Sequence, residues 1–108
     1  MGHTVGHALE ILCEYKIPHG LAVGTGLCKE AEIAEKSGLT DNLTVNKIKA
    51  ATKKYGLLIK IPYSPSDLIC AMLSDKKNTD SKITFLLPEN NGKIKEIKLS
   101  ESELINLL

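Results

Sequence analysis

A run of small, uncharged residues inside an expected helix constrains the fold more than any other feature of the sequence. Residues 21–27 read Leu-Ala-Val-Gly-Thr-Gly-Leu and occupy the first half of a helix expected over about 19–37. Each glycine in a helix costs about 1 kcal/mol relative to alanine. Close approach of another backbone or a ligand offsets that cost, because glycine has no Cβ. The run therefore predicts a helix segment that closely packed neighbours bury on most sides.

Charge and turn signals divide the rest of the chain into further elements. The second half of the 19–37 helix carries five charged residues and is expected to be a solvated face. Polar residues at 40–42, and Ser64 or Ser66, are typical of helix caps, and Asn-Gly at 91–92 is typical of a hairpin turn. The expected elements are helices over about 4–16, 19–37, 43–55 and from the serine cap to 74, strands over 83–87 and 93–99, and a short last helix from 100.

These elements define the fold class. The chain has 108 residues, a length that suits one domain. The sequence predicts a mostly α, helical bundle-like domain over 1–108 with a small C-terminal β-hairpin.

Composition excludes several classes of partner. Fourteen lysines, no arginine and thirteen acidic residues leave a net charge of +1, so neither nucleic acid nor an anionic membrane is expected to bind. No apolar run reaches the roughly 18–20 residues of a membrane span, and no signal peptide is recognisable. Three cysteines, Cys13, Cys28 and Cys70, form no CxxC pair and are expected as core or near-core thiols of a cytoplasmic protein.

The three histidines are not scattered. His3 and His7 are four residues apart and share a helix face, and His19 stands at the start of the next expected helix. Imidazoles converging from neighbouring helices suit a borderline metal, with zinc the leading candidate. The nearest carboxylates, Glu10 and Glu14, are not favoured as ligands by their spacing. The alternative is a pair of surface histidines with no metal.

The glycines around these histidines extend the pattern into a family resemblance. The chain reads Gly-His-Thr-Val-Gly-His-Ala over 2–8, then His-Gly at 19–20 and Asp-Lys-Lys over 75–77. In this order and at these separations the three motifs resemble the C-terminal helical domain of 3-dehydroquinate synthase. The resemblance covers nearly all of the chain.

That resemblance implies a site and a reaction. The family makes 3-dehydroquinate from a phosphorylated seven-carbon sugar acid in the shikimate pathway, a phosphorus–oxygen lyase reaction that releases phosphate. It uses NAD, bound mainly by a separate N-terminal domain, and zinc or cobalt held by one Glu and two His. By position, His3 and His19 are the implied metal ligands and His7 the implied catalytic proton-transfer residue. Lys76 and Lys77 are implied to bind the sugar-phosphate substrate.

Two departures from the family pattern qualify these expectations. The family's His-Gly-Glu is here His19-Gly20-Leu21, so an apolar side chain replaces a carboxylate. The chain also begins at the first motif, without the NAD-binding domain and the Glu ligand. The chain alone is therefore expected to be inactive, and the face that the missing domain would cover is expected to favour homo-oligomers.

Three other functions fit parts of the sequence. Other sugar-phosphate cyclases share both the histidine and lysine motifs. A metal-dependent alcohol or glycerol dehydrogenase has a related helical domain with His ligands. A non-catalytic helical module would carry the same histidines without binding a metal, so metal content separates it from the others.

Overall fold

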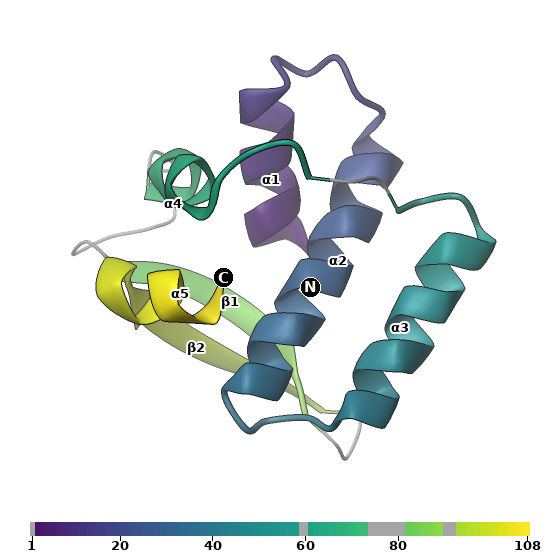
Figure 1. Ribbon diagram of the computed structural model, residues 1–108, viewed down its shortest axis with the longest axis vertical. Coiled ribbons are helices and arrows are strands. Elements are labelled where there is room, and N and C mark those ends of the chain that lie inside the picture. The colour runs from purple at the N-terminus through teal and green to yellow at the C-terminus, as the bar shows by residue number, and fades with distance from the viewer. Residues whose placement is uncertain (1, 59–60, 74–81, 90–92) are drawn as a thin grey trace.

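Helix α2 (His19–Lys36) runs through the middle of the molecule, as Figure 1 shows. The computed structural model describes residues 2–58, 61–73, 82–89 and 93–108. Over these residues the fold is mostly helical with one antiparallel hairpin, which confirms the predicted fold class. The elements beside α2 are α1 (His3–Leu12), α3 (Asn42–Lys54), α4 (Pro65–Leu73), β1 (Lys82–Pro88), β2 (Ile94–Ser100) and α5 (Glu101–Leu107).

Polar caps start the later helices where the sequence predicts them. The Asp41 carboxylate accepts a hydrogen bond from the backbone N–H of Thr44 at 2.8 Å at the start of α3. The Ser64 hydroxyl accepts from the N–H of Asp67 at 3.2 Å before α4. Ser100 ends β2 and caps α5 through a capping box. The hairpin turn expected near 89–92 lies mostly outside the described residues.

The first helix ends four residues earlier than expected. Glu14 and Tyr15 have positive φ angles of 54° and 59°, a left-handed conformation that cannot continue an α-helix. The N–H of Tyr15 donates to the carbonyl of Glu10 at 2.7 Å, and the N–H of Glu14 to that of Ile11 at 3.0 Å. This Schellman pattern turns the chain so that α2 folds back along α1 (Figure 1).

Glycines allow α1 and α2 to pack almost backbone to backbone. A Cβ at Gly26 of α2 would lie 2.5 Å from the backbone nitrogen of Gly6 and would also overlap the carbonyl oxygen of Gly2. A Cβ at Gly6 would lie 2.9 Å from the carbonyl oxygen of Ala22. The segment after α3 comes equally close, since a Cβ at Gly24 would overlap Leu57. The cost of glycine in α2 is therefore offset by close approach of protein, as the sequence predicts.

A buried carboxylate joins the same two helices. Glu30 of α2 is only 1% exposed and accepts hydrogen bonds from the backbone N–H groups of Gly2 and Val5, both at 3.1 Å. The first N–H groups of a helix have no partner within it, and a negative charge there is favourable. Glu30 thus satisfies the start of α1. The prediction that Glu30 belongs to a solvated face is wrong.

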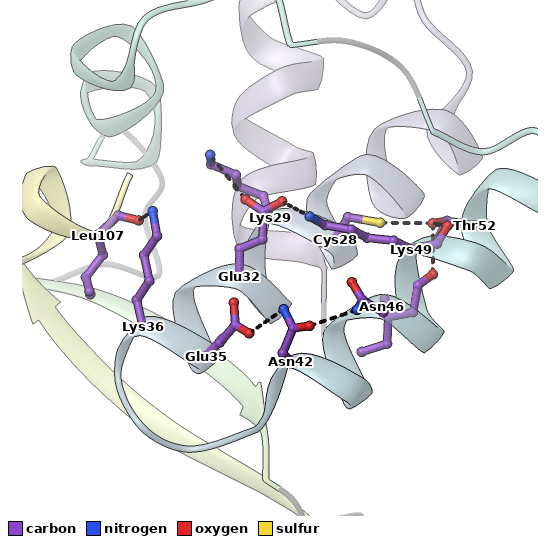
Figure 2. A network of polar contacts seen from close by, with 11 residues as sticks. Cys28, Lys29, Glu32, Glu35, Lys36, Asn42, Asn46, Lys49, Thr52 and Leu107 are labelled. Carbon is purple, nitrogen blue, oxygen red and sulfur yellow. Dashed lines mark hydrogen bonds and ion pairs between the residues drawn. The ribbon is translucent and has the colours of Figure 1, made fainter.

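The rest of that charged face is also paired rather than simply solvated. Figure 2 shows a network of polar contacts. Its part between α2 and α3 is called the α2–α3 seam below. Glu32 lies between Lys29 and Lys49, with its oxygens 3.6 and 2.8 Å from their nitrogens. The buried thiol of Cys28 lies 2.9 Å from the hydroxyl of Thr52. This seam holds α3 on α2, because α3 contributes little to the apolar core.

The apolar core lies between α1, α2, α4, the hairpin and α5. Phe85 of β1 is fully buried in this core, and the hydroxyl of Thr4 on α1 donates to the carbonyl of Thr84 at 2.9 Å. The core residues of the described chain are Val5, Ala8, Leu9, Ala22, Ile33, Ala34, Leu68, Ile69, Ala71, Met72, Ile83, Phe85, Leu87, Leu99 and Leu104.

The cysteines follow the prediction only in part. Cys28 is buried and Cys13 is half-buried, but Cys70 is exposed. Its neighbours Ile69 and Ala71 on α4 face the core, so apolar neighbours in sequence do not place Cys70 inside. None of the helices in the described parts of the chain is long and apolar enough to cross a membrane.

The glycine packing predicts opposite effects for two alanine variants of α2. Gly26→Ala is expected to destabilise the chain by about 1–3 kcal/mol or more, because backbone must move to admit the methyl group. Gly20→Ala is the control, since its Cβ meets only Leu57 Cδ2 at 3.7 Å, and it is expected to stabilise by about 0.5–1 kcal/mol. Urea unfolding measures both, and equal midpoints for the two variants would contradict the packing argument.

The buried Glu30 predicts a pH-dependent stability. Burial raises the pKa of its carboxyl, against the backbone N–H groups of Val5 and Gly2, which lower it. The folded chain therefore holds this proton more tightly than the unfolded chain, in which glutamate titrates near about pH 4.3. The contribution to stability is complete below that pH and is lost as pH rises through the raised pKa.

A non-titrating variant isolates this effect. The free energy of unfolding of the natural chain, relative to Glu30→Gln, is expected to fall as pH rises from about 4.3. Denaturant unfolding at a series of pH values gives the difference. A difference that stays constant or grows with pH would show that the buried carboxylate does not titrate in this way.

Candidate metal site

Two histidines that are 16 positions apart in the sequence meet at one side of the α1–α2 pair. His3 opens α1 and His19 opens α2, and both side chains are exposed. Their ring centroids are 6.0 Å apart, with the ring planes tilted by 49°. The fold-back of the chain after α1 brings them together. The structure thus places the two implied metal ligands side by side.

The distance between the rings is close to that of two ligands on one metal ion. With a Zn–N bond of about 2.0–2.1 Å and tetrahedral angles, the centroids of two imidazoles on one ion lie roughly 5 Å apart. The observed separation is 6.0 Å, so a small shift of the two exposed side chains would bring both rings onto one ion. In the described parts of the chain no third His, Cys, Asp or Glu joins them to form a cluster of three. These residues therefore fit two ligands of a metal and leave its other positions to groups from elsewhere.

Glu10 is the residue that the sequence reasoning missed. Its carboxylate lies 3.1 Å from Nδ1 of His19. The Glu10 side chain is 11% exposed and the His19 side chain is 65% exposed, so a buried carboxylate contacts the inner edge of an accessible ring. A usable signal was present, because Glu10 lies seven residues after His3 and therefore on the same helix face.

The structure describes only some of the remaining implied site residues. His7 is exposed one helical turn after His3, so it stands beside the ligand pair without completing a cluster of three. Leu21 is half-buried. The Asp-Lys-Lys motif with Lys76 and Lys77 lies outside the described residues.

The glycines of the first motif have a structural purpose. Gly2 and Gly6 are buried against α2, whereas His3 and His7 are exposed. The alternation lets one short helix press its backbone on α2 while it presents imidazoles at the surface.

Comparisons with known proteins agree with this fold. The sequence pattern of the family described as 3-dehydroquinate synthase C-terminal matches residues 1–78. A 3-dehydroquinate synthase of Pyrococcus abyssi is 41% identical over 108 residues, which are all of this chain and 32% of the relative. One of Alkaliphilus metalliredigens is 40% identical over 99% of this chain and 31% of the relative. The chain thus spans about a third of the length of these relatives.

A solved structure shows the same fold. The crystal structure of 2-deoxy-scyllo-inosose synthase complexed with carbaglucose-6-phosphate, NAD+ and Co2+ matches 98% of this chain with a TM-score of 0.83 at 23% identity, over 31% of that chain. A second structure of 2-deoxy-scyllo-inosose synthase gives a TM-score of 0.77. The chain therefore shares its fold with the matched third of 2-deoxy-scyllo-inosose synthase.

Sequence identity then shows the family to which the chain belongs. With residues 1–78 matching the family pattern and relatives at 40–41% identity over nearly the whole chain, this chain belongs to the 3-dehydroquinate synthase C-terminal family. The resemblance that the glycine and histidine motifs indicate is confirmed.

Proposed function

We propose that residues 1–108 form the metal- and substrate-binding domain of a 3-dehydroquinate synthase. The observation that carries the proposal is the approach of the His3 and His19 rings to 6.0 Å, in a chain of this family. The reaction would convert a phosphorylated seven-carbon sugar acid to 3-dehydroquinate and phosphate, in the shikimate pathway of the cytoplasm. An NAD-binding domain would complete the enzyme, and the chain alone would be inactive.

The proposed metal ligands of this chain are His3 and His19, and a carboxylate of the parent enzyme would be the third. When bound, zinc or cobalt supplies a Lewis acid that acidifies a substrate hydroxyl. The crystal structure of 2-deoxy-scyllo-inosose synthase is a complex with NAD+ and Co2+, which supports a metal and a nicotinamide cofactor for this fold. Both His3 and His19 are exposed, so a ligand can reach them from solvent or from a neighbouring domain.

The proposed proton carrier is His7. It lies one turn from His3 on the same exposed face, close to a ligand but outside the pair. An imidazole changes charge near neutral pH, so it can take up and return a proton within one catalytic cycle. Lys76 and Lys77 would bind the phosphate or carboxylate of the substrate as point charges.

A second function, another sugar-phosphate cyclase, is favoured by one observation. The fold matches 2-deoxy-scyllo-inosose synthase with a TM-score of 0.83. Identity to that protein is 23%, against 41% to a 3-dehydroquinate synthase, and we therefore prefer the latter. A helical module without a metal would leave the convergence of His3 and His19 unexplained.

Zinc binding tests the metal site directly. Calorimetric titration of the chain should show zinc binding that His3→Ala or His19→Ala weakens by more than about 100-fold, since even loss of a residue supporting a ligand costs 10–100-fold. His7→Ala is the matched control and should leave the affinity unchanged. Weak binding that none of the three variants alters would contradict a shared site for His3 and His19.

A chimera tests the activity. Replacing the corresponding third of the Pyrococcus abyssi 3-dehydroquinate synthase with this chain should give an enzyme that releases phosphate from the seven-carbon substrate. In this chimera His7→Ala should lower kcat by about 10²–10⁴-fold with metal content unchanged, because general acid–base catalysis contributes that much. A folded, metal-loaded chimera that turns over only a different sugar phosphate would favour the second function.

A further inference from the structure

The contact between Glu10 and His19 is made through one nitrogen of the His19 ring and leaves the other nitrogen for a metal. Glu10 Oε1 lies 3.1 Å from Nδ1 of His19, so Nδ1 is the ring nitrogen that faces this carboxylate. A carboxylate has no hydrogen to donate, so the hydrogen of this bond must be on Nδ1. In a neutral imidazole the lone pair is then on Nε2, the atom available to a metal.

We propose that Glu10 is a positioning residue that holds the His19 ring in the Nδ1–H form, with Nε2 ready to bind the metal. The proposal rests on the function proposed above. Position 21 is Leu in this chain, and the carboxylate contact of His19 comes from Glu10 of α1, across the helix pair. Such partners fix the ring orientation and raise the basicity of a ligating histidine.

Packing alone does not hold the His19 ring. Its side chain is 65% exposed, and His19 is the first residue of α2, after a cap residue with no side-chain hydrogen bond. Glu10, in contrast, is held by its burial and by the anchoring of its helix. The Glu10 side chain is 11% exposed. The end of α1 is held by the hydroxyl of Tyr63, which donates to the carbonyl of Leu12 at 3.0 Å. A fixed carboxylate beside a loosely packed ring is the arrangement in which one hydrogen bond selects the ring orientation.

The first experiment reads the tautomer without any metal. In the full chain labelled with nitrogen-15 on histidine, long-range proton–nitrogen correlation at about pH 8, where a free imidazole is neutral, reports which nitrogen carries the hydrogen. We expect His19 of the natural chain to be the Nδ1–H form. Glu10→Ala should shift His19 away from that form, with His7 as an internal reference. A natural chain with the hydrogen on Nε2 of His19 would overturn the proposal.

Graded variants separate positioning from a merely structural role. Glu10→Gln keeps an oxygen that can accept from Nδ1 and should retain the tautomer, with a smaller loss of zinc affinity than Glu10→Ala. The alanine variant should weaken zinc binding by about 10–100-fold. Glu14→Ala is the matched control, an exposed carboxylate just past the end of α1 that pairs with Lys16, and it should change neither reading.

The outcomes distinguish this proposal from the proposed function. An unchanged tautomer and an unchanged zinc affinity in a folded Glu10→Ala chain would overturn the role of Glu10. If Glu10→Ala unfolds, as shown by circular dichroism, the tautomer of the natural chain and of Glu10→Gln still decides. A different result is that neither the natural chain nor any variant binds zinc, while Glu10 still controls the Nδ1–H form of His19. The positioning role of Glu10 then stands and the proposed metal function fails.

Discussion

The close packing of α1 on α2 is the constraint on which the rest of the structure depends. It is possible only because Gly2, Gly6 and Gly26 have no side chains where the two backbones meet. The buried carboxylate of Glu30 then satisfies the first N–H groups of α1, which would otherwise be covered without a partner. Together these features fix the position of α1 along α2, and these two helices carry His3 and His19, the candidate metal ligands of this chain.

That single position also creates the site. His3 and His19 come close together because α1 is short, because the chain turns sharply after Leu12, and because α1 packs on the first half of α2. A bulky residue at the contact would push the helices apart and with them the two rings. The candidate site therefore depends on the packing of glycines that never touch a ligand.

The sequence does not predict the surroundings of the two buried carboxylates, Glu30 and Glu10. Glu30 stands among charged neighbours and reads as part of a solvated face, yet it is 1% exposed beneath the start of α1. Glu10 reads as one carboxylate among several, yet it faces the ring of His19. Periodicity gives the helix face on which a residue lies, but it does not give what covers that face. A carboxylate is buried only where donors from another element meet it, and those donors are distant in sequence.

The sequence by itself determined the order and type of the elements, most of the helix caps, the tight packing around the glycines of α2, and the family. Each of these follows from local chemistry: capping by Asp41 and Ser100, apolar spacing, and motifs that are read along the chain. Only the tertiary structure decided that α1 ends at Leu12, that Glu30 is buried, and that Glu10 meets His19. The end of α1 depends on the left-handed backbone of Glu14 and Tyr15. The surroundings of Glu30 and Glu10 depend on the angle and depth at which two helices pack, which no pattern of spacing within one helix contains.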